Sequence, residues 1–115
     1  MYKSVFVLSS LLILIAGCSK STEPDIPDWV DNLIVEFSSR EVGNPPQSIW
    51  QYEYKNRIVY YVPPQCCDQF STLYDAEGNI LGAPDGGITG AGDGRFPDFM
   101  TERKNEKLIW RDPRK

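Results

Sequence analysis

The sequence contains no histidine among its 115 residues, and only 3 cysteines. Without an imidazole, the Ser-His-Asp and Cys-His nucleophile systems are excluded, and so are zinc sites with histidine ligands. No Lys-Ser or Lys-Thr pair follows the glycine-rich stretch of the chain, which excludes a phosphate-binding loop. With the commonest catalytic constellations missing, we expect a protein that is not an enzyme.

The charge is acidic overall and unevenly distributed. The chain has 12 Lys and Arg against 16 Asp and Glu, which gives a formal net charge of −4. Six basic residues lie within residues 103–115 (Arg103, Lys104, Lys107, Arg111, Arg114 and Lys115). Such a tail either contacts anionic head groups or glycans or, more commonly, forms a solvated terminus. The acidic remainder gives no reason to expect a nucleic-acid partner.

The first eighteen residues have the order of a bacterial export signal. A short basic start, Met1-Tyr2-Lys3, precedes an apolar run from Val5 to Ile15 that ends in Ala16-Gly17-Cys18. The run is shorter than the ~20 residues that a membrane-spanning helix needs, which argues against a simple transmembrane anchor. The segment therefore resembles a bacterial lipoprotein signal peptide with its lipobox.

That resemblance implies a location and an attachment. Residues 1–17 would be removed, and Cys18 would carry palmitate-type acyl chains on its sulfur and its new amino terminus. Residues 18–25 are polar and contain a proline, as expected of a tether. Ser19 after the lipidated cysteine implies the outer membrane, with the outer leaflet of the inner membrane as the alternative. Residues 26–115 remain as one domain.

The pattern of this domain predicts an α+β fold with one N-terminal amphipathic helix on an antiparallel sheet of four or five strands. The helix is indicated by an apolar stripe (Ile26, Trp29, Val30, Leu33, Ile34 and Phe37). Strands are predicted at residues 49–54, 57–62, 72–74, 80–81 and 107–111. Lys55-Asn56 and residues 75–79 are the predicted turns, and a short helical turn is expected near residues 99–103.

Five aromatic residues fall in the first two predicted strands (Trp50, Tyr52, Tyr54, Tyr60 and Tyr61). One interpretation is an exposed aromatic platform that binds a ligand. The favoured one places one set under the helix as core, with the other set partly exposed.

Cys66 and Cys67 form the first candidate site. An exported protein rarely keeps free thiols, so a disulfide is expected, either within the chain or between chains. A redox or metal-binding role is less favoured, because the neighbouring Asp68 raises a thiol pKa and no histidine is present to lower it.

The second candidate is a loop with five glycines between Gly86 and Gly94. Asp85, Asp93 and Asp98 lie in or beside it, and carboxylates are ligands that Ca2+ prefers. The sequence matches no calcium-loop spacing, so a weak calcium site is the hypothesis and a tightly turned structural loop the alternative. No other cofactor is expected.

The residues from Val59 to Phe70, followed by Leu73-Tyr74-Asp75 and the glycine-rich segment, resemble a family of small bacterial lipoproteins defined as a domain of unknown function. The resemblance implies no activity. We therefore expect a lipid-anchored envelope module that presents its glycine-rich loop to an envelope protein, a glycan or an ion. The alternatives are a small enzyme inhibitor using residues 63–70, and a thiol redox or metal-binding protein.

Overall fold

The computed structural model describes residues 26–115. The expected signal peptide, the lipidated Cys18 and the tether of residues 18–25 lie outside the described residues. Within residues 26–115, no helix is long and apolar enough to cross a membrane.

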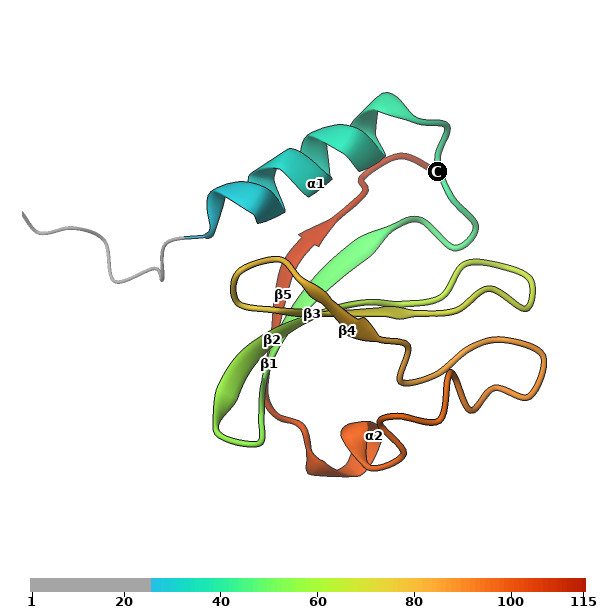
Figure 1. Ribbon diagram of the computed structural model, residues 1–115. Helices are drawn as coiled ribbons and strands as arrows, with labels where there is room; N and C mark the ends of the chain where they lie inside the picture. The colour runs from blue at the N-terminus through green and yellow to red at the C-terminus, as the bar shows by residue number, and fades with distance from the viewer. Residues whose placement is uncertain (1–25) are drawn as a thin grey trace, which may run out of the picture.

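The domain is α+β, as the sequence predicts, with one helix packed on a five-stranded antiparallel sheet (Figure 1). Its elements are α1 (Asp28–Ser39), β1 (Ser48–Tyr54), β2 (Arg57–Val62), β3 (Thr72–Asp75), β4 (Ile80–Gly82), α2 (Phe99–Glu102) and β5 (Lys104–Arg111). The sheet order is β4-β3-β2-β1-β5. The helix begins at Asp28, two residues after the start of the apolar stripe, because Pro27 is its N-cap.

Two tight hairpins fix the register of the sheet, and both predicted turns are confirmed. Lys55 and Asn56 have φ values of 50° and 63°, the left-handed pair that a two-residue hairpin turn requires. In the second turn, the Asp75 carboxylate accepts the backbone N–H groups of Glu77 and Asn79 at 3.0 and 2.9 Å. Hydrogen bonds from the Asn79 backbone lower the pKa of Asp75.

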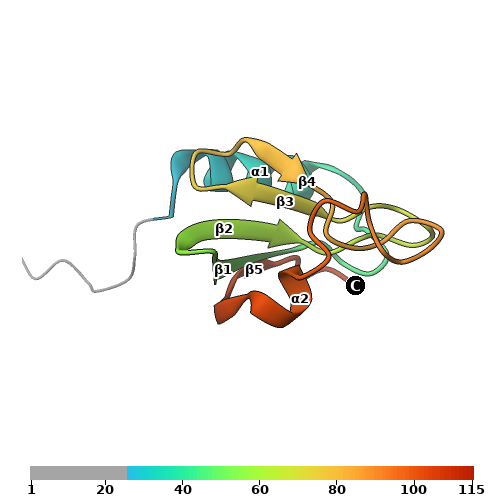
Figure 2. The ribbon, with the colours of Figure 1, turned by 60° about the horizontal axis from the view of Figure 1, so that its bottom comes forward.

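Both faces of the sheet are covered, which corrects the expectation that one aromatic set stays partly exposed. Figure 2 shows α1 on one side of the sheet and α2 on the other. Under α1 lie Val30, Phe37, Ile49, Tyr60 and Val62. On the opposite face, Tyr52, Tyr54, Val59, Tyr61, Leu73 and Phe99 form a second core.

Phe99 of α2 is the centre of that second core. It is fully buried, and its ring lies 5.3–5.6 Å from those of Tyr52, Tyr54 and Tyr61. Only Trp50 of the five strand aromatics stays half-buried, so no aromatic platform is exposed. The sheet is therefore buried on both faces, and α2 with the loop before it forms the layer on the second face.

The C-terminal tail is attached to α1 by Arg114. Its guanidinium donates to the carbonyl oxygens of Arg40 and Phe37 at 2.8 and 3.1 Å, and it pairs with the buried Asp112 carboxylate at 2.6 Å. Arg114 therefore adds a donor to the Phe37 carbonyl in the last turn of α1 and to the Arg40 carbonyl directly after it. At least this part of the basic tail has a structural role and is not simply solvated.

This attachment predicts how stability depends on pH. The hydrogen bonds from Arg114 hold the pKa of Asp112 below its usual range, so their contribution is present at neutral pH and is lost as pH falls through the lowered value. Arg114→Ala should lower the melting temperature at pH 7, and the difference from the wild type should shrink below about pH 4. Thermal melts followed by circular dichroism measure this.

Lys115→Ala removes the same charge next to Arg114 and serves as the control, with no change expected. A melting difference between Arg114→Ala and the wild type that stays constant from pH 7 to pH 2.5 would contradict the account.

Candidate functional site

Two loops that are separate in sequence meet at one end of the domain. The loop of residues 63–70 joins β2 to β3, and the glycine-rich loop of residues 83–95 follows β4; they lie side by side on the right of Figure 1. Phe70 and Gly86 form an isolated antiparallel bridge, and the Gly87 N–H donates to the Gln69 carbonyl at 2.9 Å. We call the two loops together the loop end.

Ser71 fastens the base of this contact. Its backbone N–H donates to the Asp85 carbonyl at 3.1 Å, and its hydroxyl is within 3.1 Å of both the Asp85 carbonyl oxygen and the Asp85 N–H. Ser71 is 3% exposed, so these polar groups are paired away from water. The two loops are thereby joined by backbone bonds as if they were short strands.

The glycine-rich loop is also held internally. The Gly92 N–H donates to the Gly86 carbonyl oxygen at 3.0 Å, and the Asp93 N–H donates to the Ala83 carbonyl oxygen at 2.9 Å. The Asp93 carboxylate accepts the N–H groups of Ala83 and Arg95, both at 3.0 Å, and these bonds lower its pKa. The hypothesis of a tightly turned structural loop therefore describes this segment well.

The structure does not bring the predicted calcium ligands Asp85, Asp93 and Asp98 together. Asp85 accepts the Tyr61 hydroxyl at 2.8 Å, and Asp98 accepts the Tyr54 hydroxyl while pairing with Lys55 at 3.5 Å. Among residues 26–115, no group of three or more Asp, Glu, His or Cys side chains is arranged to hold a metal ion. The first and last of these aspartates instead satisfy the hydroxyls of core tyrosines.

Cys66 and Cys67 are bonded to each other, across a cis peptide bond. Both are exposed, and the Cys66 N–H donates to the Asn44 carbonyl at 2.6 Å. The disulfide joins two adjacent residues within the 63–70 loop, and the hydrogen bond connects that loop to the segment after α1. The pair thus lies in the loop end, together with the glycine-rich loop.

Phe70 and Ile88 give the loop end an apolar surface. Their side chains are 58% and 89% exposed, and both line a shallow hollow together with Asp68, Gly87, Thr89 and Gly92. The Phe70 ring packs directly over Gly87, where a Cβ would lie 2.7 Å from a ring carbon. Sequence reasoning named both loops but missed their contact, because no local pattern signals a pairing between segments that are distant along the chain.

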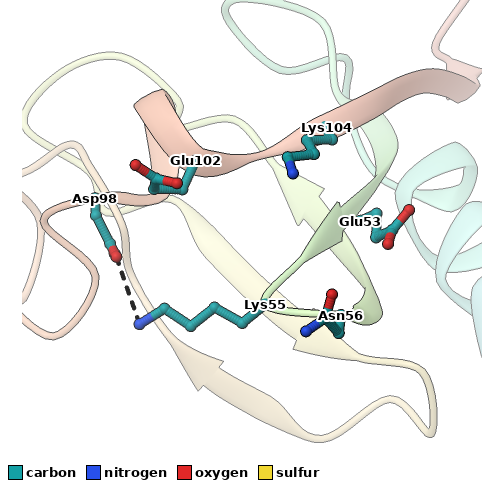
Figure 3. A pocket seen from close by; sticks show the side chains of 6 residues that line it. All are labelled: Glu53, Lys55, Asn56, Asp98, Glu102 and Lys104. Carbon is teal, nitrogen blue, oxygen red and sulfur yellow. Dashed lines mark ion pairs between the residues drawn. The ribbon is translucent and has the colours of Figure 1, made fainter.

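A second recess lies beside the turn between β1 and β2 and is lined by polar and charged residues. Figure 3 shows its lining side chains, from Glu53, Lys55, Asn56, Asp98, Glu102 and Lys104. The hydrogen bond with the Tyr54 hydroxyl lowers the pKa of Asp98 and raises that of Lys55, and the two side chains pair at 3.5 Å. The recess is therefore a group of exposed polar and charged side chains that contains the Lys55–Asp98 ion pair.

Comparison with curated proteins and with solved structures finds no match for this chain. A family model described as "Domain of unknown function (DUF6970)" matches residues 35–112, from the middle of α1 to the residue after β5. The matched region holds the whole sheet, α2 and both loops of the loop end. The chain therefore belongs to the DUF6970 family.

Proposed function

We propose that this protein is a lipid-anchored module of the bacterial cell envelope that binds a partner protein through its loop end. One observation supports this above the others: Phe70 and Ile88, from two different loops, are highly exposed and line the same hollow. Large exposed apolar side chains gathered at one place are typical of protein-binding surfaces.

The hydrogen bonds between and within the loops support the same proposal. Binding to a preformed surface costs less conformational entropy than binding that must first order two free loops. Gly87, Gly92 and the Asp93 carboxylate all contribute bonds that hold the loop end in one shape. The loop end also offers no nucleophile activated by a base, which favours binding over catalysis.

The anchor and the location are part of the proposal and rest on the sequence. Cys18 after Ile15-Ala16-Gly17 supports lipidation, and Ser19 supports transfer to the outer membrane. Residues 18–25 would then separate the domain from the membrane surface, leaving the loop end available to a partner.

An enzyme-inhibitor role is a second candidate, favoured by the geometry of residues 63–70. Residues 66–70 are exposed, and the loop contains the Cys66–Cys67 disulfide and is supported by the Gly87 N–H. A rigid exposed loop of this kind resembles the inserting segment of small inhibitors. The identity of the captured partner, enzyme or not, distinguishes the two roles.

Capture from the native envelope tests the proposal. The full-length wild type and a Phe70→Ser/Ile88→Ser variant are cross-linked in cells, purified in detergent, and their partners quantified by mass spectrometry. We expect the specific partner to fall at least tenfold in the variant, because both apolar contacts are lost.

Val35→Ser/Ile80→Ser is the matched control, since these side chains are 67% and 68% exposed but lie on α1 and β4. Their replacement should leave capture unchanged. Equal capture by the loop variant and the wild type, or equal losses in the two variants, would sink the proposal.

A further inference from the structure

A groove next to the Phe70–Ile88 hollow runs between α1 and the loop of residues 63–70, and Phe70 lines both. Its volume is about 470 Å3, within the range of about 300–1,000 Å3 that small-molecule sites occupy. Leu33 and Phe37 of α1 form one wall, and Val62 and Tyr74 of the sheet form the floor. The accessible aromatic part of the groove is therefore the half-buried Tyr74 ring, because Phe37 is buried and stacks on Trp110.

The polar side chains of the groove have their hydrogen-bonding capacity free. They come from three glutamines and two hydroxyl residues: Gln47, Gln65, Gln69, Thr72 and Tyr74. Among residues 26–115, none of these side chains hydrogen-bonds to another residue, and the Gln47 Oε1 atom is buried without any partner. Buried polar atoms are nearly always paired, so the unpaired Gln47 Oε1 points to a ligand in the groove. The other four side chains are half-buried or exposed and are accessible to such a ligand.

The charges of the groove favour a neutral ligand. Its two ionic side chains are Glu36 and Arg40, one helical turn apart on α1, and they form an ion pair with each other. Amide and hydroxyl groups offer both donors and acceptors. A ligand that fits must therefore donate and accept hydrogen bonds, carry no net charge, and offer an apolar face to an aromatic ring.

We infer that this groove binds a neutral saccharide of one or two pyranose rings. Every sugar hydroxyl both donates and accepts, as the glutamine and hydroxyl side chains require, and the C–H face of a pyranose matches the half-buried ring of Tyr74. An extended peptide fits less well, because β2 and β3 are interior strands with no free edge at which a peptide strand could be added.

Saturation-transfer NMR on the full-length protein tests this inference, in a detergent without a sugar head group. The probes are cellobiose, maltose and N,N′-diacetylchitobiose, with capped trialanine as the peptide arm. We expect transfer to the ring protons of at least one disaccharide, and none to the peptide. Tyr74→Phe/Gln69→Ala should weaken that disaccharide at least tenfold, since it removes two hydrogen-bonding groups from the groove.

Tyr60→Phe/Gln51→Ala is the control, because it makes the same chemical changes on the same face of the sheet but outside the groove. Its affinity should equal that of the wild type. The inference is overturned if no disaccharide of the panel binds, if the capped peptide binds in their place, or if the groove variant binds as tightly as the control.

Discussion

Alanine at Gly92 should cost the domain far more stability than alanine at Gly90, although both glycines have left-handed backbone conformations. Their φ values are +66° and +76°, so each substitution carries the ~1–2 kcal/mol that an L-residue loses there. The surroundings differ. A Cβ on Gly92 would lie 2.7 Å from the Asp85 nitrogen and closer still to the Ala83 carbonyl oxygen, whereas Gly90 has open space within 4 Å.

The atoms that Gly92 meets are backbone atoms of the same loop, so they cannot turn aside as a flexible side chain would. Relief requires the 83–85 segment to shift, which breaks the bond from the Asp93 N–H to the Ala83 carbonyl. Overpacking of this kind costs a further ~1–3 kcal/mol. We therefore expect Gly90→Ala to lose about 1–2 kcal/mol and Gly92→Ala about 2–5 kcal/mol, out of a typical total of about 5–15 kcal/mol.

Urea denaturation of the two variants and the wild type measures the difference, with the midpoint as the readout. Since the two substitutions share the left-handed backbone cost, the gap between them isolates the close packing of the loop. Equal midpoints for the two variants would show that the Gly92 backbone is not packed as described.

Replacing Cys18 with serine should abolish lipid labelling of the protein. If the chain is a lipoprotein, cells fed an alkyne analogue of palmitate label the wild type, and cleavage removes residues 1–17. Each buried CH2 group contributes ~0.8 kcal/mol to membrane binding, so several acyl chains hold the protein there effectively permanently. In Cys18→Ser the attachment sulfur is gone, and we expect the label to fall to background while residues 1–17 stay attached.

Cys66→Ser/Cys67→Ser is the matched control, because it removes the other two cysteines and leaves the signal segment intact. It should label as the wild type does. Labelling of Cys18→Ser at the wild-type level, or loss of labelling in the control, would contradict the proposal that Cys18 carries the lipid. In-gel fluorescence gives the label, and intact-mass measurement gives the start of the mature chain.

The elements that local patterns specify were predictable from the sequence. The stripe from Trp29 to Phe37 specifies one helix face, and Lys55-Asn56 specifies a two-residue hairpin. Both signals arise within a few residues of chain, where backbone preferences and side-chain periodicity decide the conformation. The apolar stripe begins at Ile26, whereas α1 begins two residues later, at Asp28. The spacing of apolar residues does not show that Pro27 caps the helix.

The arrangement of distant segments was not predictable in the same way. Phe99 lies in a helix of only four residues, too short for a periodic pattern, yet it completes the core on the second face of the sheet. The sequence suggested Asp85 and Asp98 as cation ligands. In the folded chain they accept hydrogen bonds from the hydroxyls of Tyr61 and Tyr54, which lie far from them in sequence. The contact between Phe70 and Gly86 likewise depends on where two loops emerge from the same end of the sheet.

The central claim is that the loop end is one preformed surface, and amide hydrogen exchange tests it most directly. In the native protein, the N–H groups of Ser71, Gly87, Gly92 and Asp93 should exchange slowly, because each donates to a backbone carbonyl at 2.9–3.1 Å. The N–H groups of Ile88 and Thr89, which make no such bond to any residue of the 26–115 segment, should exchange fast. Fast exchange at Gly87 and Gly92, equal to that at Ile88, would show two independent loops and contradict the account.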